Sequence, residues 1–405
     1  MKNFRRILLF ILLFGTMLIF GIIENIKGVS YPLIKEQFNA SWEQQGFMVS
    51  MLSVAYVGFS IIAGIFLGRF GIKPSFLFGF TALCAGLFSI FFMPGFFLTA
   101  AALFVVFAGF GFFEVGINAL ATRLFITKAA LLMNLLHSFY GIGAMIGPKA
   151  AGLIAGNAGF GWRYVYLFSL PLALAFFIPA IFIRFPEENR EADFIAGLSS
   201  TAAAEVPSPA ASRKSFFDAL KSPMVWLMSI TLGLAVTVEM SSSNWGAMYF
   251  NDVYNINPNT DGASFLSAFF LLFTVSRLVC GLFVEKIGYM RALLFSAFMV
   301  LAVFIAGFFL GGKGIYLLPS LGFFVAQFWP TLMAVAIVSF GRDAPVFSSA
   351  MIAISGLLNA AIQFFVGMTN KIFGPAWGYR STVVYTLLLI AALLLLYRRL
   401  KEQVT

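Results

Sequence analysis

The sequence predicts an all-α polytopic membrane protein of twelve transmembrane helices, arranged as two pseudo-symmetric halves of six. The chain is 61% hydrophobic and only 10% charged, whereas soluble globular proteins carry about 25% charged residues. Apolar runs of roughly 20 residues, the length that crosses a bilayer as a helix, recur along the whole chain. Helices are required because lipid does not tolerate unpaired backbone groups, and the alternating pattern of a membrane barrel is absent from the sequence.

Charged residues, Gly and Pro separate the twelve apolar runs and set the expected ends of the helices. The expected ranges are 7–34, 43–69, 74–93, 97–123, 129–155, 163–184, 223–250, 262–285, 290–311, 315–341, 346–371 and 379–397. The segment between the sixth and seventh runs is charged and then rich in Ala, Ser and Pro, so it cannot bury a core. We therefore divide the chain into an N-terminal half over 1–185, a linker over 186–222 and a C-terminal half over 223–405.

The basic residues predict the orientation in the membrane. The net charge is +10, which in a soluble protein would suggest a nucleic-acid partner. Most of the 26 Lys and Arg residues instead fall in the loops that face the cytoplasm when the N-terminus is cytoplasmic, as the positive-inside rule requires. The exceptions at the outer side are Lys35, Arg163, Lys313, Lys371 and Arg380. We expect a multi-pass inner-membrane protein with both termini and the linker in the cytoplasm, and no nucleic-acid partner.

Several function classes find no support in the sequence. Cys84 and Cys280 both lie inside apolar runs, where they predict packing residues rather than a disulfide or a metal site. No Gly-rich phosphate-binding loop with Lys and Ser or Thr occurs, which excludes an ATP-driven pump. We expect a monomeric carrier that is not an enzyme and that has no cofactor.

An internal repeat is visible at a constant offset of 217 residues, the separation of Gly71 from Gly288. Residues 64–71 and 281–288 share the pattern Gly-x-x-x-x-Arg/Lys-x-Gly, and Gly161-Trp-Arg163 aligns with Gly378-Tyr-Arg380. Two six-helix halves joined by a linker are the architecture of secondary transporters. In that architecture the substrate site lies between the halves, near the middle of the membrane.

The repeated turn after the second and eighth helices resembles that of the major facilitator superfamily. Two further stretches, Gly109-Phe-Gly111-Phe-Phe-Glu114-Val-Gly-Ile-Asn118 and Asn134-Leu-Leu-His137-Ser-Phe-Tyr-Gly141, resemble helices four and five of the fucose, galactose and glucose proton symporters. That resemblance extends to the animal sodium-dependent glucose transporters. It implies cation coupling by the helix-four acid, Glu114, and a second acid on helix one. The symporter acid on helix one aligns near Gly28, with Glu24 one turn earlier.

Ionisable side chains inside membrane spans each cost about 2.5 to 3.5 kcal/mol, so each one is a functional hypothesis that needs a partner. They are Glu24, Lys27, Glu114, His137, Glu239 and Arg277. We assign the three acids to cation coupling, with H⁺ or Na⁺ as the coupling ion, and Lys27 and Arg277 to internal ion pairs. Two structural alternatives stay open: Glu24 and Lys27 neutralise each other, and Glu114 pairs with Arg277 or His137.

Polar and aromatic side chains recur at helical spacing in both halves and predict a site for a sugar-like substrate. Carboxamides pair with substrate hydroxyls, and aromatic faces cover the C–H surface of a sugar. The candidate substrate-binding residues are Asn118, Asn134, His137, Asn244, Trp245, Gln327, Trp329, Asn359 and Gln363. All but Asn134 are expected to surround one cavity, with Gln327 and Trp329 interrupting the tenth helix. The alternatives are a packing role for His137 and a lipid-facing or core role for Trp329.

The leading hypothesis is cation-coupled symport of a monosaccharide or similar neutral polar solute, by rocking of the two halves. The main alternative is a proton-coupled efflux antiporter for amphipathic drugs or metabolites. It follows from Gly143-Ala-Met-Ile-Gly147-Pro148, which resembles the helix-five motif of drug/proton antiporters. The same Gly143 and Gly147 also predict a ridge for close helix packing.

Overall fold

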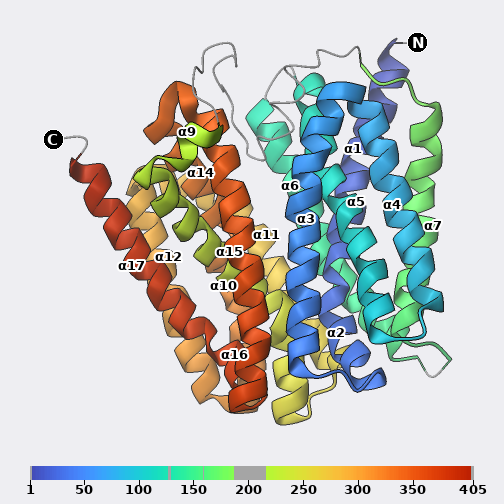
Figure 1. Cartoon of the computed structure of the whole chain (residues 1–405), viewed down its shortest axis with the longest axis vertical. Coiled ribbons are helices and arrows are strands. Elements are labelled where there is room, and N and C mark those ends of the chain that lie inside the picture. The colour runs from blue at the N-terminus through green and yellow to red at the C-terminus, as the bar shows by residue number, and fades with distance from the viewer. Residues whose placement is uncertain (1, 126–128, 158, 187–215, 403–405) are drawn as a thin grey trace. The chain divides into compact units, whose positions relative to one another are not determined.

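The computed structural model describes residues 2–125, 129–157, 159–186 and 216–402, and every regular element in those ranges is a helix (Figure 1). The expected all-α polytopic membrane protein is therefore confirmed. The chain divides into two compact units, Met1–Ala40 with Met51–Pro209, and Ser41–Ser50 with Ala210–Thr405. Most of the expected linker, residues 187–215, lies outside the described ranges.

The first unit is a bundle of long helices in which sequence neighbours and distant segments both pack. Its helices are α1 Lys2–Asn25, α2 Lys27–Gln37, α3 Trp42–Phe70, α4 Ile72–Phe92, α5 Phe96–Leu124, α6 Ala129–Ala155 and α7 Trp162–Phe182. The most extensive contacts join α4 to α5 and to α7, and α1 to α6. The first turns of α3 belong to the second unit.

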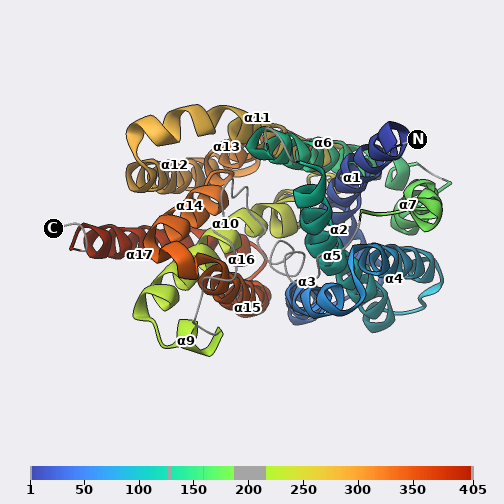
Figure 2. The same cartoon turned by 90° about the horizontal axis from the view of Figure 1, so that it is seen from above.

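The second unit contains longer and more broken helices. Its elements are α9 Phe216–Leu220, α10 Pro223–Tyr254, a π-helix Pro258–Gly262, α11 Ala263–Ile287, α12 Tyr289–Phe309, 3-10 turns Gly311–Tyr316, Leu318–Ser320 and Gly341–Asp343, α13 Leu321–Val325, α14 Phe328–Phe340, α15 Ala344–Phe373, α16 Trp377–Arg380 and α17 Thr382–Glu402. The central helix α10 packs against α15 and α17, and α11 against α13, as the view from above shows (Figure 2).

Eleven spans in the described part of the chain are long and apolar enough to cross a membrane. The 27-residue helix α6 lies between the fourth and fifth of them along the chain. Most of the expected helix ends fall within a few residues of the observed ones, and 129–155 coincides with α6. The expected continuous helices over 7–34, 315–341 and 379–397 are wrong in detail, because each is interrupted.

The first span breaks at Ile26, between α1 and α2. Pro32 inside α2 has no amide hydrogen to donate to the carbonyl of Gly28, which weakens the helical ladder just beyond the break. The span Gly311–Phe340 begins with 3-10 turns around Pro319 and is interrupted again at Gln327. The last is interrupted at Ser381, between α16 and α17.

The two repeat turns are built alike. Gly71 ends α3 and Gly288 ends α11, and both have a φ of 91°, a conformation that side-chain-bearing residues rarely adopt. The helices that follow, α4 and α12, begin and end at positions that differ by the same 217 residues. The repeat read from sequence therefore extends to the lengths of these helices.

Glycines bring α6 close to α1. A Cβ on Gly147 would lie 2.5 Å from the carbonyl oxygen of Ile22, one on Gly143 would lie 2.9 Å from the Ile22 nitrogen, and one on Gly21 would strike the Tyr140 backbone. The close-packing ridge predicted for Gly143 and Gly147 is therefore confirmed. This contact holds Tyr140 of α6 beside the end of α1.

Three basic side chains bind the free carbonyls at helix ends in the first unit. Lys73 donates to the carbonyl oxygens of Ile181 and Ile183, at 2.6 and 3.0 Å. Arg163 donates to those of Phe91 and Met93, at 2.9 and 2.6 Å, and Arg6 to that of Leu124, at 3.2 Å. Cations stabilise the carbonyl ends of helices, so these residues have a structural role.

Candidate functional site

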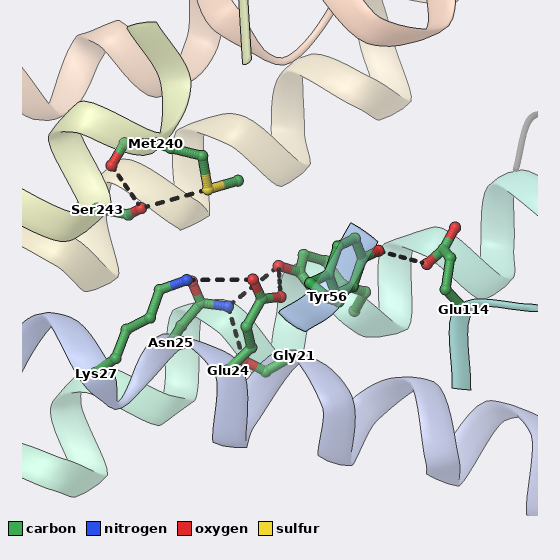
Figure 3. Close-up of polar contacts among 9 residues, drawn as sticks. Gly21, Glu24, Asn25, Lys27, Tyr56, Glu114, Met240 and Ser243 are labelled. Atoms are coloured by element: carbon green, nitrogen blue, oxygen red, sulfur yellow. Dashed lines mark hydrogen bonds and ion pairs between the residues drawn. The ribbon is translucent and has the colours of Figure 1, made fainter. Parts of the chain in front are cut away.

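The break in the first span places three polar side chains together in the interior of the first unit. Glu24, Asn25 and Lys27 are 9%, 4% and 5% exposed. The Lys27 ammonium donates to Glu24 Oε1 at 3.2 Å, and the Tyr140 hydroxyl donates to Glu24 Oε2 at 2.6 Å; Figure 3 shows the ion pair. The expected pairing of Glu24 with Lys27 is confirmed. Each carboxylate oxygen has a donor, and one of these donors carries a charge.

Asn25 and Phe107 complete this first cluster. Asn25 Nδ2 donates to the Gly21 carbonyl oxygen at 2.9 Å and to the Tyr140 hydroxyl at 3.3 Å. Tyr140 thus accepts from Asn25 while it donates to Glu24. The Lys27 ammonium also lies 5.1 Å from the centroid of the Phe107 ring, an attractive arrangement away from water. Both charges of the buried pair are therefore compensated locally.

A second carboxyl, Glu114 of α5, is half-buried and has different partners. The Tyr56 hydroxyl donates to Glu114 Oε2 at 3.1 Å (Figure 3), and Asn118 Nδ2 donates to Oε1 at 3.3 Å. The prediction that Glu114 and Asn118 share a helix face is confirmed. A Cβ on Gly111 would lie 2.7 Å from the Tyr56 carbonyl oxygen. That close approach of α3 to α5 brings the Tyr56 hydroxyl within reach of Glu114.

Aromatic packing joins the two carboxyl sites of the first unit. The Phe20 ring centroid lies 5.4 Å from that of Tyr140 and 6.4 Å from that of Tyr56, and it stacks on Phe110 at 4.7 Å. Phe20 thus packs against the tyrosine of each site. The two acids differ in one respect: a cation pairs with Glu24, whereas the two hydrogen bonds to Glu114 described above come from neutral donors.

The second unit carries a buried chain of hydrogen bonds between α10 and α15. Trp245 Nε1 donates to Gln363 Oε1 at 2.6 Å, and Gln363 Nε2 donates to Asn359 Oδ1 at 3.1 Å. Thr237 Oγ1 also donates to Asn359 Oδ1, at 3.3 Å. A Cβ on Gly233 would lie 3.2 Å from the Ser355 Cα. The glycine therefore lets the two helices approach closely enough for these side chains to meet.

Two further predicted substrate residues are buried in the second unit. Asn244 is 4% exposed, and its Oδ1 has no hydrogen-bond partner among the residues that the structure describes. Gln327 is 9% exposed, and its amide nitrogen donates to Ser296 Oγ. Gln327 lies where the span Gly311–Phe340 is interrupted, as predicted, while Trp329 lies two residues further on and is half-buried.

The remaining predicted residues lie on α6, α10 and α11. His137 of α6 is half-buried, whereas Asn134 of the same helix is exposed. Glu239 of α10 and Arg277 of α11 are both half-buried. The Arg277 guanidinium lies 4.5 Å from the centroid of the Phe273 ring. That eight of the predicted residues surround one cavity stays a prediction.

Sequence reasoning missed four residues of the clusters, namely Asn25, Tyr56, Tyr140 and Thr237. Asn25 adjoins Glu24, and Tyr140 lies one turn beyond His137, so the sequence places both beside residues that were predicted. Tyr56 lies in an apolar run, and Thr237 lies two residues before Glu239. Their partners are 58 and 122 residues away along the chain, which local periodicity does not reveal.

The helical fold with its repeated turns and buried polar clusters defines a polytopic membrane protein of the transporter type. The sequence model of the Major Facilitator Superfamily matches residues 9–351, so the chain belongs to this family and is a transporter of that kind. Among curated proteins, "Bypass of stop codon protein 6" of Saccharomyces cerevisiae is 24% identical over 293 residues. The match covers 66% of this chain and 55% of the yeast protein, so the chain spans about half the length of that relative.

Solved structures share the fold over nearly the whole chain. The nucleoside transporter NupG has a TM-score of 0.78 at 11% identity, covering 97% of this chain and 100% of that one. A bacterial homologue of the human lysosomal transporter Spinster has a TM-score of 0.76 at 14% identity, covering 98% of each chain. The fucose:proton symporter FucP of E. coli has a TM-score of 0.64 at 16% identity, covering 96% and 97%.

Proposed function

We propose that this transporter couples the symport of a neutral polar solute, a monosaccharide or a similar compound, to a cation gradient by alternating access. The observation that carries the proposal is Glu114, a half-buried carboxyl inside a membrane span with hydrogen bonds from Tyr56 and Asn118. Its neighbour Glu24 already has a cation, Lys27, at 3.2 Å. We assign the coupling role to Glu114, because it lies inside a membrane span on the same helix face as Asn118, and H⁺ or Na⁺ is the ion.

The substrate class is proposed from the second unit. Trp245, Gln363 and Asn359 offer buried donors and acceptors beside an aromatic face. Such a set pairs with hydroxyl groups and leaves no charge for an ionic substrate to meet. FucP is a fucose:proton symporter and NupG a nucleoside transporter, and both substrates contain a sugar. These two fold relatives support a sugar-like solute for this chain.

The coupling experiment compares the wild type with Glu114→Gln in proteoliposomes. A thermal-shift screen against sugars, nucleosides, amino acids and drugs first identifies a ligand, because a ligand stabilises the protein that binds it. Accumulation of that ligand is then driven by an imposed proton or sodium gradient. Glu114→Gln should exchange the ligand across the membrane but fail to accumulate it. The matched control is Glu36→Gln, an exposed acid on α2, which should accumulate ligand normally. Accumulation by Glu114→Gln at the wild-type level would remove Glu114 as the coupling residue.

The efflux alternative rests on Gly143 and Gly147. In the structure both glycines lie against the backbone of α1, which gives them a packing role that any transporter of this fold can use. The same screen separates the two functions. The antiporter would be favoured if only amphipathic drugs stabilise the protein and if the drug moves in the direction opposite to that of the protons.

We also propose that the chain lies in the inner membrane with its termini in the cytoplasm. For labelling in intact cells, both native cysteines are removed and a single cysteine is introduced at Phe217, which is 73% exposed. An impermeant reagent should miss it and should label a matched cysteine at the exposed Lys313. The reverse pattern would invert the topology.

A further inference from the structure

The Tyr56 hydroxyl is bonded to Glu114, and its oxygen is 3.1 Å from Oε2. The other donor, Asn118 Nδ2, is 3.3 Å from Oε1. The two donors differ chemically. An amide nitrogen can only donate, whereas a phenolic oxygen can donate to a carboxylate and can also accept from a carboxylic acid.

This difference matters if Glu114 takes up and releases a proton, as in the proposed function. In the ionised state both oxygens accept, one from each donor. When a proton binds at Oε2, the Tyr56 hydroxyl must turn, so that it accepts this proton in a hydrogen bond instead of donating its own. Asn118 keeps its bond to Oε1 in both states. No atom moves far, because the two oxygen atoms already lie at hydrogen-bond distance.

We propose that Tyr56 is the positioning residue whose hydrogen bond reverses as Glu114 gains and loses its proton, and that it sets the pH range of coupled transport. The inference rests on the proposed function and adds a residue to it. A Tyr56 donor bond stabilises the carboxylate more than an acceptor bond stabilises the acid, because hydrogen bonds to charged groups are the stronger ones. Tyr56 therefore favours proton release.

Tyr140 provides an internal comparison. It also donates to a carboxylate, at 2.6 Å from Glu24 Oε2, but Lys27 holds the other oxygen at 3.2 Å and Asn25 donates to the Tyr140 oxygen at 3.3 Å. Glu24 thus has a cation and a hydroxyl as donors, and the Tyr140 hydroxyl bridges Asn25 and Glu24. Tyr56 and Tyr140 both pack on Phe20, but they donate to different carboxyl groups. The groups around Tyr56 that bear on its hydrogen bond are Glu114, Asn118, Glu24 and Tyr140.

The test measures uptake into proteoliposomes at equal pH on both sides, over a series of pH values, for Tyr56→Phe and Tyr140→Phe. Loss of one hydrogen bond to a charged group should move the alkaline limb of the Tyr56→Phe profile upward by about 0.5 to 1 pH unit. Ligand affinity at acidic pH, where Glu114 is protonated, should stay within about twofold. Tyr140→Phe should keep the wild-type profile, because Lys27 still pairs with Glu24.

A second variant keeps the tyrosine shape and its hydroxyl. Replacing Tyr56 by a ring-monofluorinated tyrosine makes the hydroxyl a stronger donor, so the alkaline limb should move downward. Measurements are kept below about pH 8, at least two units below the ordinary phenol pKa of about 10, so that the hydroxyl keeps its proton. Opposite shifts by the two variants support the inference. It is overturned if the profile stays unchanged in both, or if Tyr140→Phe produces the same shift as Tyr56→Phe.

Glu114→Gln separates this inference from the proposed function. If the pH profile is flat in Glu114→Gln but of the wild-type form in both Tyr56 variants, the role proposed for Tyr56 is contradicted and the coupling role of Glu114 stands. A wild-type pH profile and full accumulation in Glu114→Gln would contradict the coupling role of Glu114, and with it both proposals.

Discussion

Gly71 and Gly288, 217 positions apart, end α3 and α11 with the same φ of 91° and begin α4 and α12, which have equal lengths. The positive φ that the two glycines share restricts what can replace them. It lets each pair of antiparallel helices follow one another with almost no loop. These turns, more than the apolar runs themselves, fix where the helices end.

Gly288→Ala should lower the free energy of unfolding by about 1 to 2 kcal/mol, the cost of a positive φ for a residue with a Cβ. Nothing lies within 4 Å of the added Cβ, so the cost is purely conformational. The control is Gly58→Ala in the middle of α3, where the Cβ also meets nothing within 4 Å. It should be neutral or stabilising, because a helix favours Ala over Gly. Thermal unfolding of the purified variants measures both, and equal losses would refute the explanation.

Lys27→Met should destabilise the first unit strongly. It leaves the Glu24 carboxylate buried with the Tyr140 hydroxyl but without its cation. Breaking one side of a buried ion pair typically costs about 3 to 5 kcal/mol. The double variant Glu24→Gln with Lys27→Met removes both charges and should recover most of that loss. A double-mutant cycle by thermal unfolding gives the coupling energy, and additive losses would show that the pair contributes no net interaction.

Gln45 and Gln44 on the first turn of α3 should respond to the same substitution with opposite signs. Gln45 is fully buried, and neither amide atom has a hydrogen-bond partner in the described part of the chain. Gln44 Oε1 accepts from the Ser41 nitrogen at 2.8 Å, and the Gln44 nitrogen donates to Ser41 Oγ at 3.3 Å, a reciprocal helix cap.

Gln45→Met should therefore raise the free energy of unfolding by about 1 to 3 kcal/mol, since it removes an unsatisfied buried amide. Gln44→Met should lower it by about 0.5 to 1 kcal/mol, since it opens half of the cap. Thermal unfolding compares the two. A loss of stability in Gln45→Met, accompanied by loss of transport, would mean that Gln45 binds a water or a ligand group instead.

Much of the fold could be predicted from the sequence because its determinants are local. The length of each apolar run sets a span, and Gly71 and Gly288 mark the turns. The breaks at Ile26 and Ser381 could not be predicted, because no glycine or proline lies at either position. They depend on what the flanking side chains meet in three dimensions.

The candidate site was only half visible in the sequence for a related reason. Helical spacing predicts partners on one helix, such as Glu114 with Asn118 and Asn359 with Gln363. It does not predict partners on different helices, such as Tyr56 with Glu114 or Trp245 with Gln363, which are 58 and 118 residues apart. Those pairs require the close approaches at Gly111 and Gly233, which are properties of the packed structure.

Asn359→Ala and Gln363→Ala should weaken binding of a sugar-like ligand by about five- to 150-fold, because each leaves substrate hydroxyls unpaired at about 1 to 3 kcal/mol. The two differ in their effect on the empty protein. Gln363→Ala also removes the acceptor of the Trp245 indole, at 2.6 Å. Asn359→Ala removes the acceptor of Gln363 Nε2 and of the Thr237 hydroxyl. Because that hydroxyl can bond to its own helix, Gln363→Ala should cost more stability than Asn359→Ala.

Ligand-concentration series of thermal shifts give affinity and stability for each variant in one measurement. The control is Thr369→Ala on the same helix, whose hydroxyl donates to the Phe365 carbonyl oxygen at 2.8 Å. That variant should keep the wild-type affinity, because its side chain lies away from the buried chain. Asn359→Ala, Gln363→Ala and Trp245→Phe could all bind the ligand as tightly as the control does. In that case the hydrogen-bonded chain holds α10 to α15 without contacting the substrate. The substrate would then have to be sought at Asn244 or Gln327, the two other predicted carboxamides that are buried in the second unit.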